Sequence, residues 1–510
     1  MSPGGLAAAA VQPQERDGPC LLGIGFDGAI PFTSSTGVRV LSEAILYRVF
    51  KVYPAYPRGE AFDHATSLLT SRFILGGFEK VKPMDTWEWL MSYRNARRKR
   101  ILIKAWRERT CRGEPHQDFE WIQPFGKTEN LPWFTIVDGH PVSGVKYVPR
   151  LIQAPHDETH LIAGPYLKPL THALKKHWNH RNWLFYASAV PEVLDEWLRS
   201  VQHARSFFWS DYSAFDATWS KRAWQMVESF YRDVLEFTTD EFWRVLDIWR
   251  TPKGKTRCKK DEVKIAYQSD ECNASGRDDT ALANALLNGI AQALSITAAM
   301  FGVRVWEVTP DMLAIAQEHV RIAVVGDDSL VACDFDVEPV RAQIIRNLED
   351  FGLCVKAASS PHLWDVTFLG QMPYLAGGQL FWGPTLGRRL YKAFWKADRV
   401  GHLCAWARGV AQQMSLNRHV PILREIGERV MELTKHHPVS DLKDENKLWT
   451  SRTSPTLPWD EGTIEWMTRR YSSLSRGMFQ ADLDVIRLVN RLPAVIHSEV
   501  FTACVAVDDL

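Results

Sequence analysis

The sequence has no strong excess of charge of either sign and no closely spaced cysteines. Its 510 residues include 61 Lys and Arg and 60 Asp and Glu, which gives a formal net charge of +1. Any surface for a polyanion must therefore arise from charge segregation within the fold. The eight cysteines stand singly, without a Cys-x-x-Cys or Cys/His ligand spacing. This scatter argues against structural zinc and a disulfide framework, and it favours a reducing compartment.

The sequence also lacks a secretory signal and a long apolar run free of polar residues. Residues 1–20 are low in complexity, and we expect them to be disordered. The most apolar long window spans residues 280–301 and carries Asn284, Asn288 and Gln292. These polar residues favour a buried amphipathic helix over a membrane span. With 45% hydrophobic and 24% charged residues, the composition is that of a globular chain, and we expect no transmembrane segment.

Two adjacent acids stand in the middle of an apolar stretch. Residues 321–333 read RIAVVGDDSLVAC, so Gly326, Asp327 and Asp328 separate two apolar runs that we expect to form a β-hairpin. Gly and Asp are ordinary turn residues, so a simple turn is one interpretation. The other is a metal site at the tip of the hairpin, and these three residues alone do not decide between the two.

A second pair of acids follows another apolar run. Residues 206–220 read SFFWSDYSAFDATWS, which predicts a strand that ends near Asp211 and a helix start beyond Asp216. If Asp211 and Asp327 met at strand ends, the two carboxylates would repel and each would resist ionisation when buried. A divalent cation such as Mg²⁺ removes this conflict, because it takes oxygen ligands from one or two carboxylates and from substrate phosphates.

A stripe of polar residues marks the apolar helix predicted above. Ser275 and Gly276 form a flexible loop before this helix, and Thr280, Asn284 and Asn288 recur at every fourth position. Such a spacing places the three side chains on one helical face. Either they serve a site or they bond to neighbouring backbone.

Positive charge is concentrated in residues 94–112, RNARRKRILIKAWRERTCR. This segment contains nine Lys and Arg and one Glu, a local net charge of +8. The pattern predicts a basic helix that packs through Ile101, Leu102, Ile103 and Trp106. A solvated helix face, a localisation signal and contact with phosphates all remain open for it.

The acids and the polar stripe together resemble a known set of motifs. They are similar, in this order, to motifs A, B and C of the RNA-dependent RNA polymerases of positive-strand RNA viruses: Asp211-x4-Asp216, Ser275-Gly276-x3-Thr280-x3-Asn284 and Gly326-Asp327-Asp328. A lone Gly-Asp-Asp is a weak signal, whereas three motifs in this order are a specific one. The resemblance covers about residues 125–395.

Flanking segments narrow the resemblance to tombusvirus-like and nodavirus-like polymerases. Upstream, PFGKTENLP (124–132) and KYVPRLIQAP (146–155) resemble the F-x-K-x-E and P-R-x-I-Q segments of that group. Downstream, FGLCVKAAS (351–359) and VTFLGQMPY (366–374) resemble its motifs D and E.

Two departures from the group's pattern concern charge. Arg277 follows Ser-Gly where an acidic residue is usual, and Ala154, Pro155 and His156 stand where an arginine is expected after P-R-x-I-Q-P. One cation for the triphosphate would then come from elsewhere, such as protonated His156 or Lys146.

The resemblance implies a role for each matched residue. The residues that would bind two divalent metal ions, Mg²⁺ or Mn²⁺, are Asp211, Asp327 and Asp328. The residues that would bind the nucleoside triphosphate are Arg150, Lys146, Lys127, Asp216, Ser275, Gly276, Thr280 and Asn284. Within this set, Asp216 and Asn284 would recognise the ribose 2′-hydroxyl. Lys356 would complete the catalytic group by protonating the pyrophosphate leaving group.

The implied fold is α+β, a right-hand polymerase with an antiparallel-sheet palm and helix-rich fingers and thumb. We expect an N-terminal extension or fingers segment over 21–120, fingers over 121–205 and 221–300, palm over 206–220 and 301–375, and thumb over 376–510. The basic residues 94–112 would line the template path, where phosphate contacts are independent of base sequence.

The implied activity is synthesis of RNA on an RNA template, for replication or transcription of a viral genome. Expected partners are template and product RNA, NTPs and other viral replication proteins, in the host cytoplasm. One alternative is a catalytically inactive polymerase fold that acts as an RNA-binding scaffold, although Asp fills every metal-ligand position. A reverse transcriptase is the other, although such enzymes usually carry an aromatic-x-Asp-Asp tip and this chain has Val325-Gly326 before its acids.

Overall fold

A computed structural model gives the architecture of the chain. It describes residues 19–29, 31–33, 37–50, 57–69, 74–127, 130–132, 134–137, 140–143, 150–187, 190–258, 262–396, 402–439 and 452–508. Residues 1–18 of the predicted disordered start lie outside the described residues. Lys146, one of the predicted triphosphate ligands, also lies outside them.

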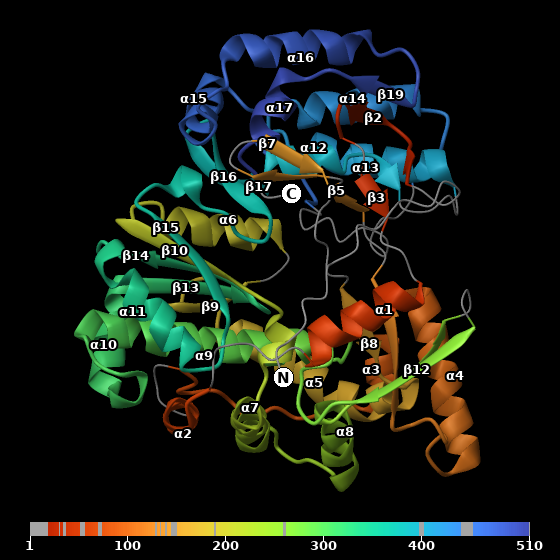
Figure 1. Cartoon of the computed structure of the whole chain (residues 1–510), viewed down its shortest axis with the longest axis vertical. Helices are drawn as coiled ribbons and strands as arrows, with labels where there is room; N and C mark the ends of the chain where they lie inside the picture. Colours follow the sequence, from red (N-terminus) through yellow and green to blue (C-terminus); the bar gives the residue numbers. More distant parts are fainter. Residues whose placement is uncertain are drawn as a thin grey trace, which may run out of the picture.

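A five-stranded sheet occupies one side of the molecule (Figure 1). Its strand order is β15-β10-β14-β13-β9, and only the β13–β9 pair is parallel. The strands are β9 (Leu184–Tyr186), β10 (Ser206–Tyr212), β13 (Val320–Val325), β14 (Asp328–Cys333) and β15 (Val355–Ser360). The predicted hairpin over 321–333 is therefore confirmed, as is the strand that ends near Asp211.

Both faces of this sheet are buried, which explains why the central parts of its inner strands are apolar. Side chains alternate between two cores: Phe208 and Ile322 face the larger core, whereas Phe207 and Ala323 face the smaller one. Such period-2 alternation is a property of extended strands. A strand with two buried faces has no need of polar residues until it reaches the sheet edge.

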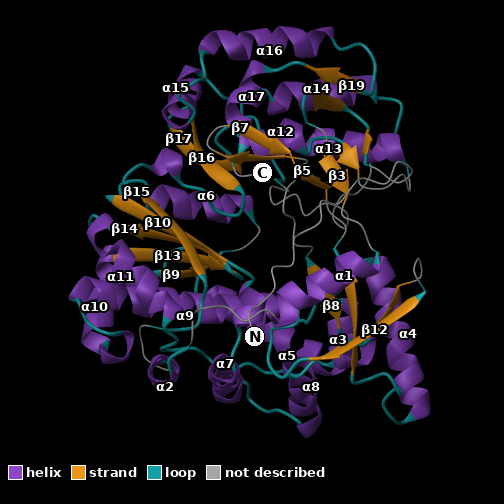
Figure 2. Ribbon diagram, viewed as in Figure 1, coloured by secondary structure: helices purple, strands orange, loops and turns teal. Residues whose placement is uncertain are grey.

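Helices cover the two faces of the sheet (Figure 2). The larger core contains residues of α9 (Thr280–Phe301), α10 (Pro310–His319) and α11 (Glu338–Glu349), and the smaller core contains residues of α6 (Pro191–Ser200). Helix α9 is long and apolar enough to cross a membrane, but 94% of its most apolar window is buried inside the protein. This confirms the prediction of a buried helix over 280–301.

A second region combines helices with a four-stranded sheet of order β12-β11-β4-β8. The strands are β4 (Trp121–Gly126), β8 (Leu151–Ala154), β11 (Lys253–Cys258) and β12 (Val263–Gln268). The helices are α1 (Val38–Ile45), the π-helix η1 (Leu46–Phe50), α2 (Gly59–Leu68), α3 (Thr86–Met91), α4 (Ala96–Arg112), α5 (Asp157–His177), α7 (Lys221–Val234) and α8 (Asp240–Arg250). Helix α4 confirms the basic helix predicted over 94–112.

The C-terminal region is mainly helical, as the sequence beyond 390 predicts. Its elements are the hairpin β16 (Gln371–Ala376) and β17 (Gln379–Pro384), α12 (Leu386–Tyr391), β18 (Trp395–Lys396), α13 (Leu403–Leu416), α14 (Leu423–Leu433), α15 (Glu461–Arg470), α16 (Arg476–Leu488), β19 (Ala494–Ile496) and α17 (Glu499–Val505). The expected palm–thumb boundary after residue 375 falls inside β16, so it divides a hairpin.

The first two strands of the chain join this C-terminal region rather than the rest of the N-terminal half. Strand β2 (Ile24–Phe26) pairs in parallel with β19, and β1 (Cys20–Leu21) pairs with β18. Ile24 and Phe26 are buried in the same core as the C-terminal helices. The expected segment 21–120 is therefore split between two regions, a long-range pairing that local sequence patterns do not report.

Candidate active site

The turn between β13 and β14 presents two acids at the edge of the five-stranded sheet. Val325 pairs with Asp328, so Gly326 and Asp327 form a two-residue turn. Gly326 has a φ of 59°, a conformation that glycine adopts without steric cost. Glycine with positive φ in the first central position is the pattern of a type II′ hairpin turn. The local fold therefore projects Asp327 and Asp328 beyond the apolar strands.

Strand register brings Asp211 to the same edge. The β10–β14 ladder ends with Ser210 opposite Ser329, so Asp211 and Asp328 are the next residues of the two strands beyond that pair. On its other side, Asp211 pairs with Lys356 of β15. Directly opposed residues on neighbouring strands have Cβ atoms about 4.5–5.5 Å apart. The sheet thus gathers three of the predicted metal ligands and the predicted proton donor.

The turn acids are difficult to ionise in this setting. Burial, followed by the neighbouring carboxylates of Asp327 and Asp211, raises the pKa of Asp328 to about 7. Burial also raises the pKa of Asp327, and the charge of Asp211 adds to this rise. Both shifts report negative charges gathered where water cannot fully solvate them. A cation at this edge would stabilise the ionised forms.

Asp216 lies in a separate hydrogen-bonded chain beside these acids. The Asn284 side-chain amide donates to Asp216 Oδ1 at 2.9 Å, and Asn284 Oδ1 accepts from Asn273 Nδ2 at 2.6 Å. Burial raises the pKa of Asp216 to about 6, although the Asn284 hydrogen bond acts against the rise. The structure therefore brings together the predicted ribose-recognition pair and adds Asn273, which the sequence did not single out.

The loop before α9 is packed against strand β8. The Gln153 amide donates to the Ser275 carbonyl at 2.7 Å. Gly276 has a φ of 121°, and a Cβ there would lie 2.9 Å from the Gln153 carbonyl oxygen, so glycine is required on both grounds. The Thr280 hydroxyl donates to the Ala274 carbonyl at 3.1 Å, which holds the loop itself.

Arg277, the departure from the group's pattern, points into the core. Its guanidinium is fully buried, lies 2.6 Å from Asp279 Oδ2 and stacks 4.1 Å from the centre of the Trp224 ring. Tyr231 donates a further hydrogen bond to Asp279 at 3.0 Å. The arginine therefore anchors the loop to the core instead of facing a substrate.

Cations surround the acidic edge from three parts of the chain. The Lys127 amide donates to the Arg150 carbonyl at 2.8 Å, so the β4–β8 ladder sets these two predicted triphosphate ligands side by side. Arg150 and Arg48 both act to lower the pKa of Asp327, although burial outweighs them. Arg388 acts in the same direction on Asp328. Sequence reasoning missed Arg48 and Arg388, because no local motif marks either one.

His156 does not supply the missing cation. Its side chain caps α5 by accepting from the Glu158 amide at 3.3 Å, and its ring stacks on His116 with the ring centres 4.9 Å apart. Burial lowers the pKa of His156. A neutral capping imidazole therefore replaces the protonated ligand considered from the sequence.

The acids at this edge suit a hard divalent cation. Within the described ranges, no group of three or more His, Cys, Asp or Glu side chains encloses a metal position. Mg²⁺ does not need such an enclosure, because it is commonly held by one or two carboxylates with water and substrate phosphates completing its shell. Asp211, Asp327 and Asp328 offer only oxygen donors, and burial together with neighbouring carboxylates raises the pKa values of the last two.

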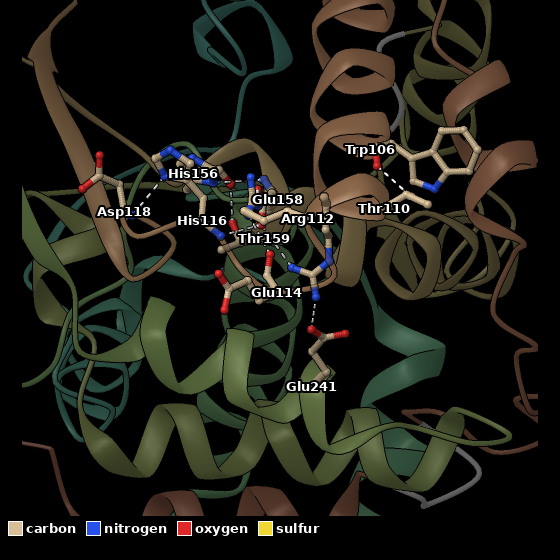
Figure 3. A network of polar contacts seen from close by, with 11 residues as sticks. Trp106, Thr110, Arg112, Glu114, His116, Asp118, His156, Glu158, Thr159 and Glu241 are labelled. Atoms are coloured by element: carbon tan, nitrogen blue, oxygen red, sulfur yellow. Dashed lines mark hydrogen bonds and ion pairs between the residues drawn. The ribbon is translucent and has the colours of Figure 1, made fainter.

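The basic helix α4 uses one face for intramolecular ion pairs (Figure 3). Arg109 and Arg112 both pair with Glu158 at the start of α5. Arg98 pairs with Asp157, and Arg109 also contacts Glu241. These contacts fasten α4 to α5 and α8, so part of the basic segment is structural.

The central part of the chain is similar to a known protein family. Residues 150–377 match the family model described as viral RNA-dependent RNA polymerase. The matched stretch contains all strands of the five-stranded sheet, the acidic turn and α9. A search of curated proteins finds no match. The family match supports a viral RNA-dependent RNA polymerase, an RNA-directed nucleotidyltransferase that acts on template RNA and NTPs.

Proposed function

We propose that the chain copies viral RNA by metal-assisted nucleotidyl transfer at the edge of the five-stranded sheet. The observation that carries this proposal is that Asp211, which pairs with Lys356, and Asp328, which adjoins the Gly326–Asp327 turn, both directly follow the Ser210–Ser329 pair at the sheet edge. The sheet would be the palm, the region around α4, α5 and β11–β12 the fingers, and the C-terminal helices the thumb. The segments that resemble tombusvirus-like and nodavirus-like polymerases support that subtype.

Asp211, Asp327 and Asp328 would hold the divalent ions. When bound there, two such ions would neutralise charge on the attacking and leaving oxygens of an in-line phosphoryl transfer. The chain's own work would then be positioning, since phosphoryl transfer leaves little covalent chemistry for side chains. The primer 3′-oxygen would bond to the α-phosphorus as the pyrophosphate oxygen departs, and Lys356 would give that oxygen a proton.

Arg150, with Lys127 and Lys146, would hold the triphosphate. An arginine fork binds phosphate oxygens through two parallel hydrogen bonds, which fixes orientation as well as position. Ser275, Gly276 and Thr280 would shape the loop that meets the template and the incoming nucleotide.

Asp216 and Asn284 would test the ribose. Their mutual hydrogen bond at 2.9 Å leaves a polar pair that a 2′-hydroxyl could join. A deoxynucleotide would leave this partly buried pair without that partner, which is a strong basis for discrimination. This arrangement favours ribonucleotides over the substrates of a reverse transcriptase.

The outward face of α4 would contact RNA phosphates. Arg97, Arg100, Lys104 and Arg107 are exposed and follow a 3-4-3 spacing, which places them on one helical face away from the paired arginines. Figure 1 shows α4 at the outer edge of the molecule, on the opposite side from the five-stranded sheet. This stripe would therefore hold template RNA at a distance from the acids. The proposed location of the protein is the host cytoplasm, where such genomes are copied.

Salt dependence tests the stripe. Replacing Arg97 and Arg100 by Gln should reduce the slope of log Kobs against log salt by about 0.7 for each lost phosphate contact with single-stranded RNA. The matched control replaces Arg476 and Arg487, two exposed arginines of α16, and should leave the slope unchanged. Equal slopes for both variants would show that the stripe does not contact RNA phosphates.

Primer extension tests the activity itself. Purified protein, an RNA primer–template, labelled NTPs and Mg²⁺ or Mn²⁺ should yield extended product, and Asp327→Ala should abolish it while RNA binding persists. Incorporation by Asp327→Ala equal to that of wild type would refute the proposed site. Binding of RNA without incorporation by either protein would favour the inactive scaffold.

A further inference from the structure

Asn288 is the member of the α9 polar stripe to which the proposed mechanism gives no task. It is fully buried, one helical turn beyond Asn284. Its side-chain amide donates to three consecutive backbone carbonyls of the acidic turn: Gly326 at 3.2 Å, Asp327 at 3.0 Å and Asp328 at 3.3 Å. One side chain therefore contacts the backbone of every residue of the Gly-Asp-Asp motif.

The orientation of this amide is fixed by strand β10. The Tyr212 hydroxyl donates to Asn288 Oδ1 at 2.9 Å, so the amide nitrogen must face the turn. Tyr212 directly follows Asp211, the first proposed metal ligand. Asn288 thus bridges the two chain segments that carry the acids.

The next turn of the helix repeats the pattern. Gln292 Nε2 lies 2.8 Å from Ser210 Oγ, 2.8 Å from the Tyr212 hydroxyl and 2.9 Å from Ser329 Oγ. Ser210 and Ser329 are the last pair of the β10–β14 ladder before the acids, and their hydroxyls are 2.6 Å apart. The polar network therefore ties α9 to both strands directly beneath the site.

We infer that Asn288 is a positioning residue that sets the acidic turn against Asp211. This inference rests on the proposed function and deepens it, because a hairpin turn held only by its own strands can shift relative to its neighbour. Deviations of about 1 Å at a reacting centre can cost about 10²-fold in rate. Asn288 acts through the turn backbone and does not touch substrate.

Asn288→Leu keeps the branched shape of the side chain and removes the donors. We expect kcat for nucleotide addition to fall about 10²-fold, the KM for NTP to stay within about threefold, and the Mg²⁺ concentration for half-maximal rate to rise. Tyr212→Phe removes only the bond that orients the amide, so it should give a smaller change in the same direction. In the Asn288→Leu background, Tyr212→Phe should add little further loss.

Asn347→Leu is the matched control. Asn347 is also fully buried, and its Nδ2 donates to a single carbonyl, that of Ser295 on the same helix α9, at 2.9 Å. It should lower the unfolding midpoint as Asn288→Leu does, yet leave kcat and the Mg²⁺ requirement of the folded protein unchanged. Equal effects of the two variants on kcat and Mg²⁺ requirement would overturn the inference.

A readout without catalysis separates this inference from the proposed function. Mg²⁺ should raise the thermal unfolding midpoint of wild type, and the concentration needed should be higher for Asn288→Leu than for Asn347→Leu. If wild type incorporates no nucleotide but this difference holds, the positioning role stands and the polymerase proposal fails. If wild type is active and Asn288→Leu matches it in kcat and Mg²⁺ response, the positioning role fails alone.

Discussion

Glu158 at the start of α5 and Asp328 at the tip of the β13–β14 hairpin are both carboxyl groups withdrawn from water. Burial alone would raise the pKa of Glu158, but the His116 amide and Arg112 outweigh it, so the pKa is lowered. At Asp328, burial and the charges of Asp327 and Asp211 act together and raise the pKa to about 7. The same functional group is therefore stabilised as an anion in one place and destabilised in the other.

The difference lies in what the chain supplies around each acid. Glu158 receives two arginines from α4, which complete an ion-pair network among three helices. The turn acids face other acids, and arginines act on them only in part. Glu158 therefore stabilises the structure through its own arginines, whereas the acids at the sheet edge form the site that we propose for a cation from outside the chain.

The largest effect should come from removing one of the acids at the edge of the five-stranded sheet. Asp211→Asn should lower nucleotide incorporation about 10³-fold, equivalent to about 4 kcal/mol of transition-state stabilisation. Because Asp211 is exposed, the free energy of unfolding should stay within about 0.5 kcal/mol of wild type. Single-nucleotide extension and denaturant unfolding measure the two quantities. Undiminished incorporation would contradict a metal role for Asp211.

Removing the charge of Glu158, which pairs with two arginines, should lower stability instead. Glu158→Gln leaves two arginines without their buried partner and should cost about 3 kcal/mol of unfolding free energy. Glu241→Gln is the control, because Glu241 is 46% exposed and an exposed pair contributes about 0–1 kcal/mol. Denaturation midpoints compare the two, and incorporation per folded molecule should persist in both. Equal small losses would show that the α4–α5 network is not a stabilising element.

Binding of Mg²⁺ should distinguish the turn acids from Glu158. At ten times its Kd, Mg²⁺ should stabilise wild type by about 1.4 kcal/mol through mass action. Asp327→Asn with Asp328→Asn should lose this stabilisation, and Glu158→Gln should keep it. Thermal unfolding with and without EDTA is the measurement. A Mg²⁺ effect that survives in the double variant would place the ion elsewhere.

The smallest effect concerns pH. The folded-state pKa of Glu158 lies below its ordinary value of 4.5, so its contribution to stability is present above about pH 4.5 and is lost as pH falls through the lowered pKa. The difference in unfolding midpoint between wild type and Glu158→Gln should therefore be largest at neutral pH and shrink in acid. A difference that grows below pH 4.5 would reverse the assigned sign.

Sequence reasoning performs well where the signal is local. The hairpin at 321–333, helix α9, helix α4 and strand β10 all lie where hydrophobic periodicity places them, because side-chain spacing reflects the element's own geometry. Hydrophobic periodicity gives no such signal over residues 253–258, which read KGKTRC. The structure has the hairpin β11–β12 there, since pairing with β4 stabilises a strand with little apolar character.

The residues of the candidate site also divide into those that local motifs predict and those that only the fold reveals. Asp211, Asp216, Asn284 and the turn acids were predicted from motif order, and the structure brings them together. Arg48 and Arg388 come from segments without a motif, so only the fold reveals their influence on the acids.

By itself, the sequence determined the main helices and strands, the order of the acids and the family resemblance, because each depends on short runs of residues. Only the tertiary structure decided which acids are paired, which residue opposes Asp211 and which carbonyls Asn288 contacts. These depend on strand register and on helices that meet across the core, and a shift of one residue in a register exchanges every partner along the strand. Long-range pairing therefore decides which acids of this protein are held by its own arginines and which lie beside other acids.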